Sequence, residues 1–217
     1  MNTKTFKIFL AVFVQLAIVL TVTGVKYTQS VNGVEVLLKI RPVDPTDILR
    51  GDYVTLAYDI DRFQIRDGYV FEEGTNTAMS GFKSYMGYVG EMQKDDVVYV
   101  GLERMESSKY WGFSGHISTQ MPEFVDPTRE VYLKGVIESE YKEDVGSAPE
   151  GDEYYRYSSQ VQHITIRYNN LDRYDIPQGT GQGFDPAKFE FSVRVNVKPR
   201  DGNAVIKQVY KDGVPWP

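Results

Sequence analysis

Apolar and polar residues alternate along several segments of the chain, and this spacing of two predicts β-strands. The clearest example covers residues 189–197, where an apolar face made by Phe189, Phe191, Val193, Val195 and Val197 alternates with polar residues. Successive side chains of a strand point to opposite faces, so strict alternation predicts one buried and one solvent-facing side. That arrangement is typical of antiparallel sheets.

The same reasoning extends to most of the chain beyond residue 26. Val54, Leu56, Tyr58 and Ile60 share one predicted face of a strand over 52–60. Further strands are predicted over 34–41, 69–71, 97–102, 110–118, 130–137, 157–168 and 204–210. No helical period is sustained after residue 26. We therefore predict a mainly β domain, built as an antiparallel sandwich or a partly open barrel.

Turn residues and charge runs separate these strands. Asp67-Gly68 and Asp201-Gly202 predict hairpins between their flanking segments, and Asp212-Gly213 predicts the end of the last strand. Residues 138–153 carry seven carboxylates against one lysine, which predicts a solvated acidic link. Residues 75–90 predict an irregular excursion around a short helix.

The N-terminal segment has a different pattern. Lys7 and Lys26 bracket 18 uncharged and mostly apolar residues, 8–25. A membrane-spanning helix needs roughly 20 apolar residues, with about 17 as the lower limit, and its positive flank stays in the cytoplasm. We expect residues 1–26 to anchor the protein in the cell membrane and 27–217 to form an extracytoplasmic domain. A signal peptide cleaved near Gly24 is the alternative.

Charge and composition exclude several kinds of function. Removing Lys4, Lys7 and Lys26 from the net charge of −6 leaves −9 for residues 27–217. This acidic balance argues against binding of nucleic acids or anionic lipid surfaces. Cysteine is absent, which excludes disulfides and thiolate chemistry. His116 and His163 have no second histidine at a metal-binding spacing, so we predict neither a metal nor a cofactor.

The most specific motif lies at residues 50–58, which read Arg-Gly-Asp-Tyr-Val-Thr-Leu-Ala-Tyr and contain G-D-Y-x-x-L-x-Y without a mismatch. This string resembles the signature of the GDYXXLXY family, bacterial proteins of unknown activity with one membrane anchor and an outer domain. Residues 174–181 resemble a second family block, with Gln178 in place of its usual acid. Residues 202–206 and 212–213 resemble a C-terminal block.

The resemblance implies a set of motif residues whose role is unknown: Arg50, Gly51, Asp52, Tyr53, Leu56, Tyr58, Pro177, Gly179 and Gly181. It also implies a polytopic membrane protein as partner, and hence a binding or accessory module. On physical grounds Gly51 suits a tight turn that Asp52 caps, while Leu56 and Tyr58 face a core. In the alternative interpretation Arg50, Asp52 and Tyr53 contact a partner or ligand.

An enzymatic alternative is a peptidase that is similar to type I signal peptidases. Those enzymes also combine an N-terminal anchor with an outer β domain. Ser30 would be the nucleophile and Lys134 the base, and a lysine base must be desolvated to stay neutral. The sequence departs from that family because Ser30 is not followed by Met-x-Pro and no G-D-N-x-x-x-S block is present.

Overall fold

The chain divides into two compact units, Met1–Gly33 and Val34–Pro217. The structure, a computed structural model, describes residues 7, 10, 12–21, 24, 33–41, 53–66, 69–72, 92–105, 108–123, 125–144 and 160–217. In the first unit, residues 12–21 are helical. The membrane-spanning helix expected over 8–25 falls partly outside the described residues, and those that are described contain no helix both long and apolar enough to cross a membrane.

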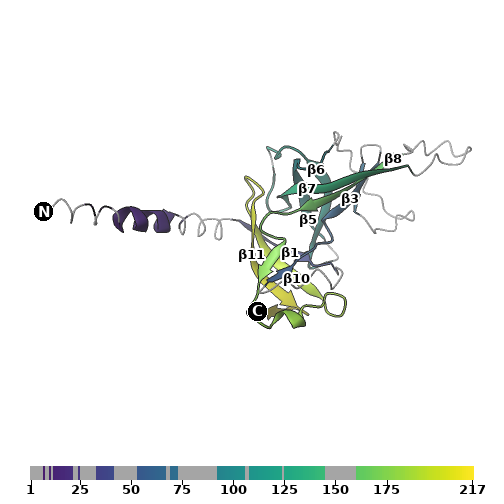
Figure 1. The fold of residues 1–217 in the computed structure, drawn as a ribbon. Coiled ribbons are helices and arrows are strands. Elements are labelled where there is room, and N and C mark those ends of the chain that lie inside the picture. The colour runs from purple at the N-terminus through teal and green to yellow at the C-terminus, as the bar shows by residue number, and fades with distance from the viewer. Residues whose placement is uncertain are drawn as a thin grey trace, which may run out of the picture. The chain divides into compact units, whose positions relative to one another are not determined.

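The second unit is mainly β, as predicted (Figure 1). Its strands are β1 (Val34–Lys39), β2 (Tyr53–Thr55), β3 (Arg62–Arg66), β4 (Tyr69–Glu72), β5 (Val97–Arg104), β6 (Trp111–Ser118), β7 (Glu130–Asp144), β8 (Gln160–Arg167), β9 (Arg173–Asp175), β10 (Phe191–Val197), β11 (Ala204–Lys211) and β12 (Val214–Trp216). A short 3-10 helix, η2, covers Gly181–Gly183. The short helix predicted within residues 75–90 lies outside the described residues.

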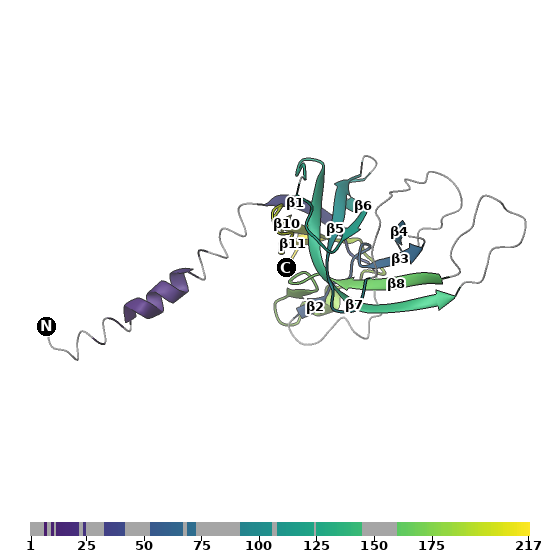
Figure 2. The ribbon, with the colours of Figure 1, turned by 90° about the horizontal axis from the view of Figure 1, so that it is seen from above.

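The strands in the described part of the chain form three antiparallel sheets. A six-stranded sheet has the order β4-β3-β8-β7-β5-β6, a four-stranded sheet the order β1-β10-β11-β12, and β2 pairs with β9 alone. The six-stranded sheet curls like half of a barrel, and its long strands β7 and β8 run side by side (Figure 2). One continuous hydrophobic core joins the sheets, since it contains Leu38 of β1, Val195 of β10, Val100 of β5 and Leu133 of β7.

The alternating pattern predicts the buried apolar faces correctly, but the predicted solvent-facing side of β10 is largely buried, because Ser192 and Asn196 are only 4% and 3% exposed. In β10 the apolar face is at most 1% exposed, and Phe189, which lies before the strand, is 39% exposed. The predicted strand over 52–60 is regular only over Tyr53–Thr55. Its alternation nevertheless continues, because Val54, Leu56, Tyr58 and Ile60 are all buried. A single bridge from Tyr58 to Ile40 replaces a regular ladder there.

One prediction about a link was wrong, and one about a turn was incomplete. Residues 138–144 are not part of an acidic link but the second half of β7, where they pair with β8. Asp212-Gly213 ends β11 as predicted, but β11 is not the last strand, because β12 follows and pairs back onto it. Both turn residues have positive φ, 49° and 80°, which is the geometry of a two-residue hairpin. The predicted pairing across Asp67-Gly68 is confirmed by β3 and β4.

Candidate functional site

The two motif segments, which start 124 residues apart along the chain (174 − 50), lie next to each other in the fold. β2 of the first segment pairs with β9 of the second, so that Tyr53 faces Asp175 and Val54 faces Tyr174. The Leu56 amide extends the ladder by donating to the Asp172 carbonyl at 2.9 Å. The residues of the first motif therefore meet those of the second through their backbones.

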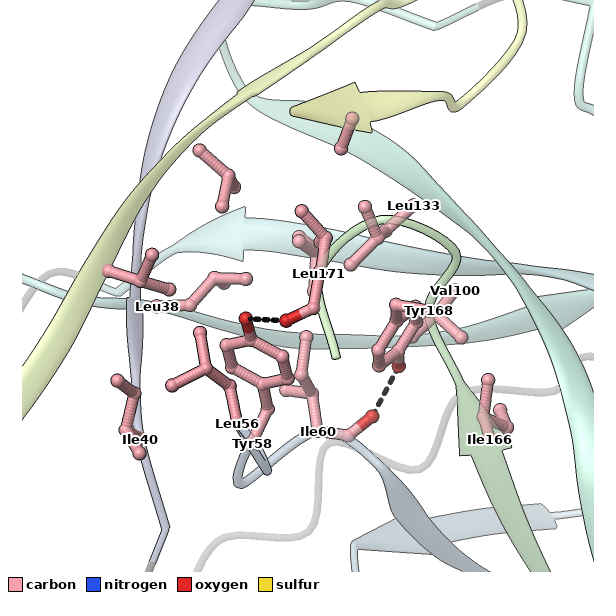
Figure 3. Packing of buried hydrophobic residues seen from close by; sticks show 14 of the residues in the cluster. Leu38, Ile40, Leu56, Tyr58, Ile60, Val100, Leu133, Ile166, Tyr168 and Leu171 are labelled. Carbon is pink, nitrogen blue, oxygen red and sulfur yellow. Dashed lines mark hydrogen bonds between the residues drawn. The ribbon is translucent and has the colours of Figure 1, made fainter. Parts of the chain in front are cut away.

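Tyr58 stabilises the pairing of β2 with β9 from the core side. Its hydroxyl donates a 2.6 Å hydrogen bond to the Leu171 carbonyl, three residues beyond Tyr168. The Tyr168 hydroxyl in turn donates to the carbonyl of Ile60, two residues beyond Tyr58. The two rings meet edge to face with centroids 6.2 Å apart (Figure 3). Each tyrosine thus holds the turn that follows the other, and we call this pair the tyrosine latch.

Burial is the main cause of an altered pKa at Tyr58. It raises the pKa of the phenol well above 10.0, and the carboxylates of Asp172 and Asp61 add to the effect. The phenol is therefore neutral and keeps its proton for the bond to Leu171. Phenols of this kind work as structural donors rather than as bases at neutral pH.

A partly buried ion pair closes the turn after Tyr58. Asp61 accepts a hydrogen bond from the Tyr58 amide at 3.1 Å, and Arg41 Nη2 lies 3.2 Å from its Oδ1. Burial nevertheless raises the pKa of the Asp61 carboxyl above 3.8, because its desolvation outweighs the attraction of the Arg41 guanidinium. The Arg41 amide also donates to the Ala57 carbonyl, so β1 and the motif are joined at this point.

The outward side of the β2–β9 pair carries polar groups. The Arg173 guanidinium stacks on the Tyr53 ring, with Cζ 3.7 Å from the ring centroid. Its Nε also lies 3.1 Å from Asp175 Oδ1. The side chains of Arg173 and Asp175 are 58% and 81% exposed. We call these three residues, Tyr53, Arg173 and Asp175, the outward patch.

The second motif ends in a tight turn. The hydroxyl of Thr180 donates to the Pro177 carbonyl at 2.6 Å, and the Thr180 amide donates to the same oxygen. Gly179 has φ of +82°, a conformation that side chains other than glycine rarely adopt. Gly181 is buried at the start of η2. These residues shape the backbone and bring no reactive group.

A family model described as GDYXXLXY protein matches residues 15–209, most of the chain. The chain belongs to the GDYXXLXY family. No curated protein and no solved structure matches it. The suspected family is thereby confirmed, and the pairing of β2 with β9 joins two of the segments that resemble family blocks.

The structure separates the GDYXXLXY signature residues into two groups. Leu56 and Tyr58 face the core as predicted, and Tyr53 lies on the opposite side. Arg50, Gly51 and Asp52 lie outside the described residues, as does Ser30. Lys134 lies in β7 between Leu133 and Gly135 and is half-buried, with its backbone amide bonded to the Gly202 carbonyl. Because Ser30 is not described, the pairing of Ser30 with Lys134 stays a prediction.

Sequence reasoning missed Tyr168 and a polar cluster on β6 and β7. In that cluster Glu130 Oε1 accepts a 2.5 Å hydrogen bond from the Ser114 hydroxyl and lies 3.3 Å from His116 Nδ1. Ser114 and His116 lie where the register of β6 against β5 shifts, opposite Gly101, and both contact the same carboxylate oxygen. The Ser114 hydroxyl is directed at a carboxylate and not at the imidazole. This order differs from the serine–histidine arrangement that activates a nucleophile.

Proposed function

We propose that the protein is an extracytoplasmic binding or accessory module, tethered to the cell membrane through residues 8–25, that docks a polytopic membrane protein through its outward patch. The observation that carries the proposal is the division of the motif pair into two sides. Leu56 and Tyr58 hold the pair from the core, while Tyr53 and Arg173 are stacked on the other side. A preordered cation and aromatic ring lose little side-chain entropy on binding.

The chemistry of the outward patch suits protein recognition. Tyrosine and arginine are the residue types enriched where protein interfaces are energetically most important. The Arg173 guanidinium keeps donors for a partner's carbonyl or carboxylate oxygens while its face rests on Tyr53. Exposed Asp175 adds an acceptor beside it.

The membrane tether rests on the uncharged run of residues 8–25 and on the apolar side chains along the helix, of which Phe13 is 70% exposed. The cysteine-free chain allows a direct test in whole cells. A single cysteine replaces Val214, which is 65% exposed, or Lys4 in a matched variant. We expect a membrane-impermeant maleimide to label Val214→Cys in intact cells and Lys4→Cys only after lysis. Protection of Val214→Cys until lysis would contradict the outward location.

Docking is tested by photocrosslinking of the full chain in its native membrane. A photoreactive amino acid replaces Tyr53, and the matched control carries it at Tyr141, which is 57% exposed. We expect Tyr53, and not Tyr141, to crosslink a protein with several transmembrane segments, identified by mass spectrometry. Adding Arg173→Ala is expected to lower the crosslink yield by about tenfold, as for a residue at the centre of an interface.

The exposed arginine Arg194 supplies the control for this last step. Its side chain is 46% exposed, and its guanidinium also lies over a tyrosine ring, with Cζ 5.1 Å from the Tyr210 centroid. Arg194→Ala should leave the Tyr53 crosslink unchanged. Equal crosslinking from Tyr53 and Tyr141, or equal losses with the two arginine variants, would show that the outward patch is not the contact.

A further inference from the structure

A cleft of about 390 Å³ lies beside the GDYXXLXY signature, and no function has yet been assigned to it. Its lining includes Leu38 and Lys39 of β1, Asp59 and Ile60 directly after Tyr58, and Trp111 at the start of β6. The volume falls within the range of small-molecule sites, about 300–1,000 Å³. The tyrosine latch holds one wall, because Tyr168 bonds the carbonyl of Ile60.

Apolar side chains form the walls of the cleft. Leu38 and Ile60 are 1% and 3% exposed and belong to the core. Trp111 is half-buried and packs against that core, while Met105 is 41% exposed. Gly112 keeps the space for Met105, since a Cβ there would lie 3.1 Å from the methionine sulfur. The cleft therefore has a hydrophobic interior and a broad aromatic wall.

The carboxylate of Glu190 lies at the rim of the cleft and is fixed by several hydrogen bonds. Glu190 Oε1 accepts hydrogen bonds from Lys109 Nζ at 2.7 Å and from the Tyr110 hydroxyl at 2.6 Å. Its backbone is fixed as well, because the Glu190 amide donates to Asp212 Oδ1 and its carbonyl accepts from the Asp212 amide. The Lys109 ammonium lowers the pKa of the Glu190 carboxyl, so the group is ionised at neutral pH.

A second ion pair lies on the same rim. Lys39 Nζ is 3.7 Å from Asp59 Oδ2, and both residues line the cleft. Glu190 also lines the cleft, and its partner Lys109 lies outside the lining residues. Each of the two carboxylates in the lining, Asp59 and Glu190, therefore has one lysine partner that balances its formal charge. A site of this kind has no excess positive charge for a phosphate or a nucleotide, and the domain around it is acidic.

We propose that this cleft binds a neutral saccharide, a mono- or disaccharide unit. A sugar hydroxyl both donates and accepts, so neighbouring hydroxyls match a carboxylate acceptor set beside an ammonium donor. The lining offers this combination in Lys39 and Asp59, and Glu190 adds a second carboxylate acceptor. The flat C–H face of a sugar ring matches the apolar wall of Trp111 and Met105. Saccharide binding here does not depend on the outward patch or on a membrane partner.

The test uses the full chain, purified in a detergent without a sugar headgroup so that the detergent does not compete. Chitobiose, cellobiose and maltose are titrated separately, and the dipeptide Ala-Ala serves as a zwitterionic competitor class. Binding is followed by saturation-transfer NMR and by tryptophan fluorescence. We expect at least one disaccharide to bind saturably and to receive magnetisation on its ring protons, and Ala-Ala not to bind.

Isosteric variants connect the binding to the cleft. Glu190→Gln and Asp59→Asn each remove one charge while keeping the shape, and each is expected to weaken disaccharide binding by about tenfold. Glu143→Gln, which changes an exposed carboxylate outside the cleft lining, is the matched control and should bind as the wild type does. Tyr110→Phe keeps the ring and should weaken binding by a smaller factor.

Three outcomes would overturn the proposal. The first is the absence of saturable binding for all three disaccharides. The second is equal affinity in Glu190→Gln, Asp59→Asn and Glu143→Gln, which would place the sugar elsewhere. The third is saturable binding of Ala-Ala that responds to the cleft variants, which would make the cleft a zwitterion site. Unchanged near-ultraviolet circular dichroism in each variant establishes that a loss of affinity is not a loss of fold.

Discussion

Removing one hydroxyl of the tyrosine latch is expected to destabilise the whole β unit. Tyr58→Phe keeps the ring in the core but takes away the donor that lies 2.6 Å from the Leu171 carbonyl. Both residues are buried, at 2% and 0% exposed, so water cannot readily replace the lost donor. A buried acceptor that loses its partner costs about 1–3 kcal/mol. Tyr168→Phe, which frees the Ile60 carbonyl, should cost a similar amount.

The two substitutions should not be additive. Each hydroxyl holds the turn that follows the other ring, and the rings are in edge contact at 6.2 Å. Once one of the two hydroxyl–carbonyl hydrogen bonds is lost, the turn that it held can move. The remaining hydrogen bond is then less well aligned and contributes less to stability. The double variant Tyr58→Phe, Tyr168→Phe should therefore cost less than the sum of the single variants, by about 0.5 kcal/mol or more.

Thermal unfolding of the full chain, followed by near-ultraviolet circular dichroism, measures these effects. For a chain of this size about 1 kcal/mol corresponds to a shift of about 2–4 °C in Tm, so each single variant should lower Tm by about 2–12 °C. Tyr141→Phe is the matched control, because this side chain is 57% exposed, and its Tm should not change. Single variants that melt with the control, or strictly additive losses, would refute the latch.

Two further predictions concern the same region. Asp61→Asn should remove a contribution to stability that falls as pH rises, because the raised pKa of Asp61 makes the folded state bind more protons than the unfolded state above pH 3.8. In melts between pH 3.5 and 7 the Tm of the variant should therefore rise more, or fall less, with pH than that of the wild type, and an unchanged slope would count against this. Gly135→Ala should cost about 1–3 kcal/mol, because its Cβ would collide with Ile166 Cγ2 and lie 3.2 Å from the Arg167 carbonyl. Gly183→Ala, whose Cβ would meet only Trp216 at 3.6 Å, is the control, and equal Tm values for the two variants would contradict the packing argument.

Strand positions were predictable because alternation is a local property. Side chains separated by two residues fall on one face of any pleated strand, so the buried residues of β10 and of 54–60 could be identified without knowing their partners. The second half of β7 was missed because its acidic composition resembles a solvated link. The pairing of this half with β8 is made by backbone hydrogen bonds, and these cannot be inferred from the acidic side chains of the segment.

The candidate sites show how far local patterns extend. The signature string identified Tyr53, Leu56 and Tyr58 and the face that each occupies. It carried no information about Tyr168, because the two tyrosines meet only after the chain returns over more than a hundred residues. The cleft was equally hidden, since Lys39, Asp59, Tyr110 and Glu190 come from four separate segments.

The amino-acid sequence alone was therefore enough to establish the family, the mainly β architecture and the inward or outward direction of most strand residues. Each of these follows from short-range spacing or from a contiguous string. The pairing of β2 with β9, the reciprocal bonds of the tyrosine latch and the grouping of charges around the cleft were decided by the tertiary structure. They depend on which distant strands share one core, and that choice is made by the packing of the whole domain rather than by any single segment.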